Sequence, residues 1–145
     1  MKRLILMMPL VLLPLAGFAQ GPAISMGNGE ANSIVTDGAT RDGATLTFPQ
    51  VLIEGEGWLV LHPFKDGKPQ GEVVAGYAPV ASGLSGNVAV TVDPAPETGD
   101  LFIVMLHSDA NANGRFDFVF INEREVVDKA VFEGSKMIGQ VYLVP

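Results

Sequence analysis

The chain contains no cysteine. This absence excludes a disulfide-stabilised scaffold, a cysteine-ligated zinc or iron–sulfur site, a catalytic thiol and a lipid anchor on an N-terminal cysteine. It also excludes a blue-copper centre, because that centre requires a thiolate ligand. The stability of the folded chain must therefore come from its hydrophobic core.

Basic residues are also scarce. Nine Lys and Arg stand against sixteen Asp and Glu among 145 residues, which gives a formal net charge of −7. Such an acidic balance argues against nucleic acid and anionic lipid surfaces as partners. With 48% hydrophobic and 17% charged residues, the composition nevertheless excludes a globally disordered chain. The length fits one domain.

The longest apolar run lies at the N-terminus. Lys2 and Arg3 precede an apolar run over residues 4–16 that contains two prolines, and small residues follow it. A bilayer span takes about 20 apolar residues, so the run is too short for an anchor. The pattern predicts a secretory signal peptide over residues 1–19. Its cleavage would remove Lys2 and Arg3 and change the formal charge from −7 to −9. We therefore expect an exported protein, periplasmic or secreted, that does not insert into the membrane.

The rest of the chain has the pattern of an all-β domain. Residues 20–33 are rich in Gly, Asn and Ser without periodicity, which predicts a flexible leader. From residue 34 onward, short apolar runs alternate with turn signals, and no window has helical spacing. Strands are expected at residues 44–48, 51–53, 58–62, 72–77, 87–92, 101–106, 116–120 and 137–144. About eight short strands at this spacing predict a single antiparallel β-sandwich over residues 34–145, Ig-like or cupredoxin-like in outline.

The segment after the most apolar strand matches the front of a calcium-binding loop. The motif D-x-[DN]-x-[DN]-G-x-x-D is formed by Asp109, Asn111, Asn113, Gly114 and Asp117. Ca²⁺ takes six to eight oxygen ligands, and the backbone carbonyl of Arg115 can add one to the side chains. Phe120 stands where such loops carry a bidentate Glu, so the expected affinity is weak, about 10⁻⁴–10⁻³ M. The alternative is a plain turn in which Asn and Asp side chains bond their own backbone.

Two histidines form a second candidate site. His62 and His107 each end one of the two most apolar strands, and Met105 shares a strand face with His107. Imidazole and thioether ligands together suit copper or zinc. The alternative is two unrelated histidines at the rim of the sandwich, each hydrogen-bonded to backbone or water.

Five segments in order resemble an uncharacterised domain family known from surface proteins of halophilic archaea and exported proteins of proteobacteria. They are WLVLHPFKDGKP, VAGYAPV, VAVTVD, LFIVMLHSDANANGRFDF and VVDKAVFEG. The family pattern falls here on His62, Met105, His107, Asp109, Asn111, Asn113, Gly114, Asp117 and Phe118. The resemblance covers residues 44–145. It implies a secreted β-sandwich, often a module within larger surface proteins, and no activity.

Catalytic signatures are absent from the sequence, which lacks a nucleophile elbow, a phosphate-binding loop and a tuned acid–base pair. The first hypothesis is therefore a non-catalytic exported module that binds an unknown protein, surface or small ligand, with a weak structural calcium loop. The second is a periplasmic copper- or zinc-binding protein that uses His62, His107 and Met105. Geometry separates the two: imidazoles more than ~8 Å apart cannot share one ion, whereas a separation within ~4 Å favours a metal site.

Overall fold

The structure is a computed structural model that describes residues 23–118 and 127–145. Its strands are β1 (Ser25–Gly27), β2 (Ser33–Val35), β3 (Thr40–Asp42), β4 (Thr45–Ile53), β5 (Gly57–Lys65), β6 (Lys68–Pro69), β7 (Gly76–Val80), β8 (Gly83–Thr91), β9 (Leu101–Ser108), β10 (Phe132–Glu133) and β11 (Lys136–Leu143). Among these residues no helix is long and apolar enough to cross a membrane. The expected signal peptide lies outside the described residues.

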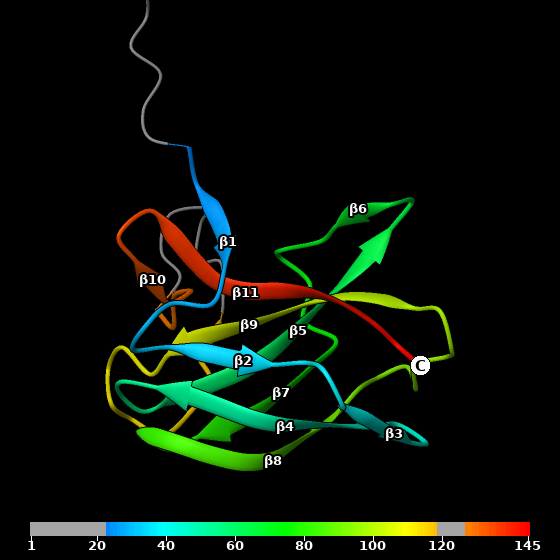
Figure 1. Ribbon diagram of the computed structural model, residues 1–145, viewed down its shortest axis with the longest axis horizontal. Helices are drawn as coiled ribbons and strands as arrows, with labels where there is room; N and C mark the ends of the chain where they lie inside the picture. Colours follow the sequence, from blue (N-terminus) through cyan, green and yellow to red (C-terminus); the bar gives the residue numbers. More distant parts are fainter. Residues whose placement is uncertain (1–22, 119–126) are drawn as a thin grey trace, which may run out of the picture.

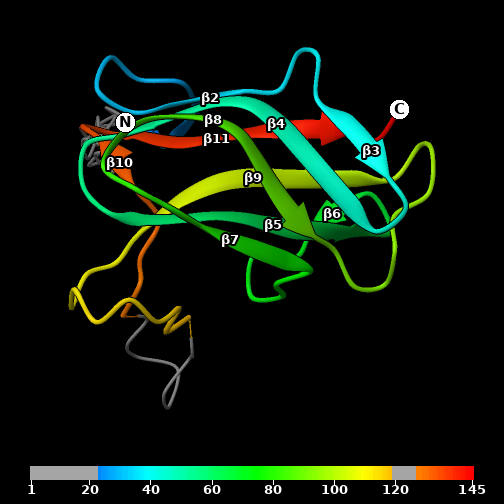
Figure 2. The same ribbon diagram turned by 90° about the horizontal axis from the view of Figure 1, so that it is seen from below.

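Two sheets pack face to face, which confirms the predicted β-sandwich (Figures 1 and 2). The seven-stranded sheet has the order β1-β11-β9-β5-β6, with β7 also on β5 and β10 also on β11. The four-stranded sheet has the order β2-β4-β3, with β8 also on β4. Pairing is antiparallel except between β1 and β11, which run parallel. The described residues hold eleven strands instead of about eight, because β1, β2, β3, β6 and β10 are too short to show periodicity. The strand expected over residues 116–120 is wrong where the structure describes it, since residues 116–118 belong to no strand.

The core lies between the two sheets and follows the alternation of apolar residues. Leu46 and Phe48 on the first half of β4 and Val51 and Ile53 on its second half all belong to it. Contrary to expectation, one continuous strand runs through Pro49 instead of two strands separated by it. The β4–β8 register skips Pro49, so its missing N–H leaves no ladder bond unmade.

Strands β5 and β9 are buried on both faces. Their residues Leu59, Leu61, Phe102, Val104 and Leu106 point into the core between the sheets. The alternate positions, which include His62 and His107, lie on the outer face of the seven-stranded sheet, and both histidines are also buried. Figure 2 shows that residues 109–118, which follow β9, lie on the side of this sheet away from β4 and β8.

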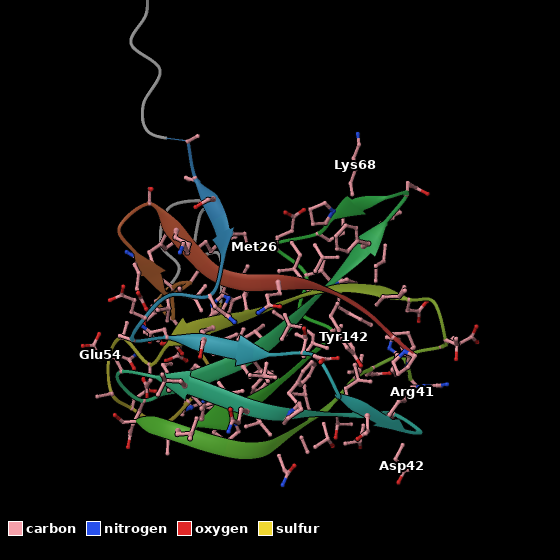
Figure 3. All side chains as sticks on the ribbon, in the orientation of Figure 1. Met26, Arg41, Asp42, Glu54, Lys68 and Tyr142 are labelled. Carbon is pink, nitrogen blue, oxygen red and sulfur yellow. The ribbon has the colours of Figure 1, made fainter. Side chains whose placement is uncertain are left out.

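The segment expected as a flexible leader forms strand β1 and begins β2 within its described part. Met26 on β1 lies beside β11 (Figure 3). The carboxylate of Glu133 accepts the backbone N–H groups of Glu30, Ala31 and Asn32 at 2.8, 3.1 and 2.7 Å. The prediction for residues 20–33 is therefore corrected over residues 25–33. This Gly/Asn-rich turn is ordered by a carboxylate that is distant in the sequence. A prediction from local sequence pattern cannot detect such a contact.

Candidate functional site

Met105 lies between the two histidines on the outer face of the seven-stranded sheet. The register of β5 and β9 places three consecutive pairs on this face: Trp58 with His107, Val60 with Met105, and His62 with Ile103. The histidines are thus not opposite each other. They are separated along the strands by the Val60–Met105 pair, and their side chains lean toward each other above it.

The imidazole rings meet through their Nε2 atoms, which are 3.4 Å apart. The other nitrogen of each ring, Nδ1, is hydrogen-bonded to a backbone carbonyl. His62 donates its Nδ1–H to the carbonyl of Val73 at 2.8 Å, and His107 donates its Nδ1–H to the carbonyl of Asp128 at 2.7 Å. The exposed fractions of the two histidines are 0% and 1%. They are therefore not unrelated residues at the rim of the sandwich.

These hydrogen bonds decide the tautomer of both rings. A carbonyl oxygen only accepts, so each Nδ1 must carry the hydrogen and each neutral ring has an unprotonated Nε2. Two lone pairs then face each other with no hydrogen between them. A tetrahedral ion with metal–nitrogen bonds of 2.0–2.1 Å holds its nitrogen ligands about 3.3–3.4 Å apart. The observed separation is that of two ligands of one ion.

The surroundings favour the neutral form of both rings. Burial lowers the pKa of His62, against a smaller opposing effect of its bond to Val73. The pKa of His107 is lowered to about 4, mainly by burial; the bond to Asp128 opposes this lowering, and the neighbouring His62 adds a smaller lowering. Neutral imidazole is the form that binds metal ions. At pH 7 both Nε2 atoms are therefore available as ligands.

A cavity of about 330 Å³ lies over this pair. Both histidines line it together with Met105 from β9 and Met137 from β11. No carboxylate is among the described residues that line it, and its one charged residue, Lys129, is exposed. The cavity therefore offers nitrogen and sulfur donors in apolar surroundings.

Two phenylalanines from the segment after β9 pack against the imidazoles. The ring of Phe118 lies edge-on to His62 and His107, with centroids 5.5 and 5.0 Å apart. Phe116 stacks on Phe118 at 5.8 Å and also contacts His107 at 5.8 Å. These rings separate the imidazoles from solvent, which explains how two histidines on the outer face of the sheet become buried. His62 does not end its strand as expected, since β5 continues to Lys65.

The side chains of the candidate calcium loop form hydrogen bonds within the loop. The carboxylate of Asp109 accepts the backbone N–H groups of Asn113 and Gly114 at 3.2 and 2.8 Å. The side-chain amides of Asn111 and Asn113 donate to Asp117 at 3.0 and 2.6 Å, and these bonds lower the pKa of Asp117. The predicted side chains are therefore brought together on an exposed loop.

The backbone of Arg115 belongs to the same loop, since its N–H donates to the side-chain oxygen of Asn113 at 2.8 Å. Phe120, at the twelfth loop position, lies outside the described residues. Every bond found here fits the plain-turn alternative, and calcium binding stays a prediction.

Asp128 connects the loop to the histidines, and sequence reasoning missed it. Its side chain is fully buried. Its carboxylate accepts the backbone N–H groups of Ala110 and Asp117 at 3.1 and 2.8 Å, while its carbonyl accepts from His107. Met137 was missed as well. Alternation with the buried Ile138 predicts that Met137 lies on the outer face of its strand. The sequence does not predict that this strand pairs with β9, which brings Met137 to the histidines.

All of these residues lie within one family match. Residues 32–140 match the family described as Domain of unknown function (DUF7282). The chain belongs to this family. No curated protein and no solved structure matches it. The match includes both histidines, both cavity methionines and the whole loop, and the family description names no activity.

Among the described residues, no group of three or more His, Cys, Asp and Glu side chains has the arrangement of a metal site. The imidazole pair contributes only two such groups. Its further neighbours are thioethers, which are ligands of a different type. A site here would consist of nitrogen and sulfur, without carboxylate.

Proposed function

We propose that the protein is a non-catalytic β-sandwich module that binds one transition-metal ion, copper or zinc, through His62, His107 and Met105. The observation that carries the proposal is the pair of unprotonated Nε2 atoms 3.4 Å apart. Two facing lone pairs repel each other unless a cation or a proton lies between them. A bound metal ion supplies the missing positive charge.

The hydrogen bonds behind the rings support this assignment. Metal-bound histidines commonly donate their second ring N–H to a backbone carbonyl or a carboxylate, which orients the ring and increases its basicity. Val73 and Asp128 provide such carbonyls at 2.8 and 2.7 Å. Both rings are therefore held in a ligand orientation by the protein alone.

The position of Met105 supports a mixed nitrogen and sulfur site. Its strand position falls between those of the two histidines on one sheet face, and it lines the same cavity. Thioether and imidazole ligands suit copper and zinc, whereas Ca²⁺ and Mg²⁺ require oxygen. The ion bound at this pair is therefore distinct from any calcium bound by the exposed loop.

The proposal also includes export from the cytoplasm. The pattern of residues 1–19 predicts a signal peptide, so the module would meet its metal in the periplasm or outside the cell. Its acidic balance leaves nucleic acid an unsuitable partner. A protein, surface or small ligand that exchanges metal with the site fits better.

The test is metal analysis of the protein purified from its native compartment, followed by titration of the stripped protein with Zn²⁺ and with Cu(I). We expect one equivalent of metal, and loss of binding in His62→Asn and in His107→Asn. Asparagine keeps a donor near the Nδ1 position and removes Nε2, so the bond to the carbonyl is retained. Gln50→Asn, at an exposed residue of β4 in the four-stranded sheet, is the control. Failure of the folded wild-type protein to bind either ion, or full binding by both histidine variants, refutes the proposal.

A further inference from the structure

We propose that Met137 completes a site of two imidazoles and two thioethers that selects Cu(I) over divalent ions. This inference rests on the proposed function and specifies its ligand. The third and fourth donors come from different strands, Met105 from β9 and Met137 from β11, and both line the cavity that contains the two histidines.

The strand geometry brings Met137 to this cavity. On β11, Ile138 is fully buried in the core between the sheets, so Met137 and Gly139 face the outer side. Gly139 pairs with Met105 on β9. Met137 is the next outward residue of β11, in the direction in which β9 continues from Met105 to His107.

Two small residues keep the space between these donors open. A Cβ on Gly139 would lie 3.0 Å from the Cβ of Met105, tighter than nine in ten real contacts. Glycine therefore leaves room beside the Met105 side chain. Ala130 forms the bridge partner of His107 and also lines the cavity. A larger side chain there would fill the space between His107 and Met137.

The charge of the donor set decides between ions. Two neutral imidazoles and two thioethers bring no negative charge, and no carboxylate lines the cavity among the described residues. Born desolvation grows with the square of the charge, so burying a divalent ion without an anionic ligand costs about four times as much as burying a monovalent one. Lys129, the one charged residue among the described residues that line the cavity, is positive and increases this difference.

The softness of the ligands acts in the same direction. Thioethers select Cu(I), whereas Zn²⁺ and Cu²⁺ bind better where carboxylate, thiolate or water completes their shell. Phe118 lies edge-on against both imidazoles and restricts access of water to them. The site therefore holds a monovalent soft ion at lower cost than a hydrated divalent one.

The test is competition between the stripped full chain and a chromophoric Cu(I) chelator under reducing conditions, with parallel Zn²⁺ titrations. We expect Cu(I) to bind more tightly than Zn²⁺. Met137→Leu should weaken Cu(I) binding by about 10- to 100-fold or more, the range for loss of even an outer metal-site partner. Its Zn²⁺ affinity should stay unchanged. Leu84→Met is the control, because it makes the reverse exchange at a residue of β8, in the other sheet, that is 64% exposed.

X-ray absorption on the wild-type Cu(I) complex gives an independent measurement that needs no variant. We expect two sulfur and two nitrogen scatterers. One sulfur scatterer, or unchanged Cu(I) affinity in Met137→Leu, overturns the role of Met137 and leaves the His62–His107–Met105 site standing. Zn²⁺ binding tighter than Cu(I) overturns the selectivity alone. Absence of binding by either ion to the folded wild-type protein overturns both this inference and the proposed function.

Discussion

Acidification should destabilise the metal-free protein through His107. The folded protein lowers the pKa of this histidine to about 4, mainly because the ring is buried. In the unfolded chain the same ring has a pKa of about 6.5. Between these values the unfolded chain takes up a proton that the folded protein excludes. The contribution of His107 to stability is therefore complete above pH 6.5 or so and is lost as the pH falls toward 4.

The size of the effect follows from the two pKa values. The full gap of about 2.5 units corresponds to about 3.4 kcal/mol, since each unit is worth 1.36 kcal/mol. At pH 4.5 most of this loss is already reached, about 2.5 kcal/mol. The pKa of His62 is also lowered by burial, so its loss has the same sign. A typical domain has a stability of about 5–15 kcal/mol, which makes the effect readily measurable.

The assay is urea unfolding at pH 7.0 and pH 4.5 in the presence of a chelator, for the wild-type protein and for His107→Asn. Protonation of carboxylates also destabilises the protein in acid; Glu133 is an example, because its hydrogen bonds lower its pKa. These carboxylates are present in both proteins, so their contribution cancels when the two losses of stability are compared. We expect the loss between the two pH values to be about 2.5 kcal/mol smaller in the variant. Equal losses in both proteins would show that His107 is not held neutral, and the reasoning about the imidazole pair would fail.

Three further predictions concern other parts of the molecule. Ca²⁺ at millimolar concentration should raise the melting temperature, and Asp109→Ala should abolish the rise; no shift at about 10 mM, above the affinity of such loops, contradicts the calcium prediction. Tyr142→Phe removes a buried hydroxyl without a partner among the described residues, so urea unfolding should show a gain of about 1 kcal/mol, and a loss of that size contradicts it. Gly57→Ala places a Cβ against the carbonyl of His107, which should cost about 1–3 kcal/mol and weaken metal binding; unchanged melting contradicts this.

The sandwich itself follows from local pattern. Residues 58–62 and 101–106 are apolar on both faces, and they form the central strands β5 and β9. Alternation also places Met105 and His107 on one face, because it depends only on neighbours along one strand. The same local logic fails at residues 25–33, where order depends on Glu133 from the far end of the chain. Figure 3 shows a comparable case at Tyr142, which lies near Arg41 although the two are distant in sequence.

The contact between the two imidazoles could not be predicted from the alternation of residues along the strands. The sequence pattern ends one strand at each histidine, although β5 continues past His62 to Lys65. Because β5 and β9 run antiparallel, strand pattern alone places the two histidines toward opposite ends of the pair. His62 lies opposite Ile103, four residues from His107, or about 13 Å along the strand. Side chains pointing straight out from the sheet at that separation would not meet.

They meet because each ring is anchored at its outer nitrogen by a segment that leaves the sheet. The carbonyl of Val73, before β7, fixes the Nδ1 atom of His62, and the carbonyl of Asp128, before β10, fixes that of His107. Each anchor turns the remaining nitrogen inward, over Met105. Neither anchor has a side-chain signature, since both use backbone oxygen. The ligand pair is therefore a property of two loop backbones as much as of two histidines, and a sequence that keeps the histidines but displaces residue 73 or 128 should lose the site.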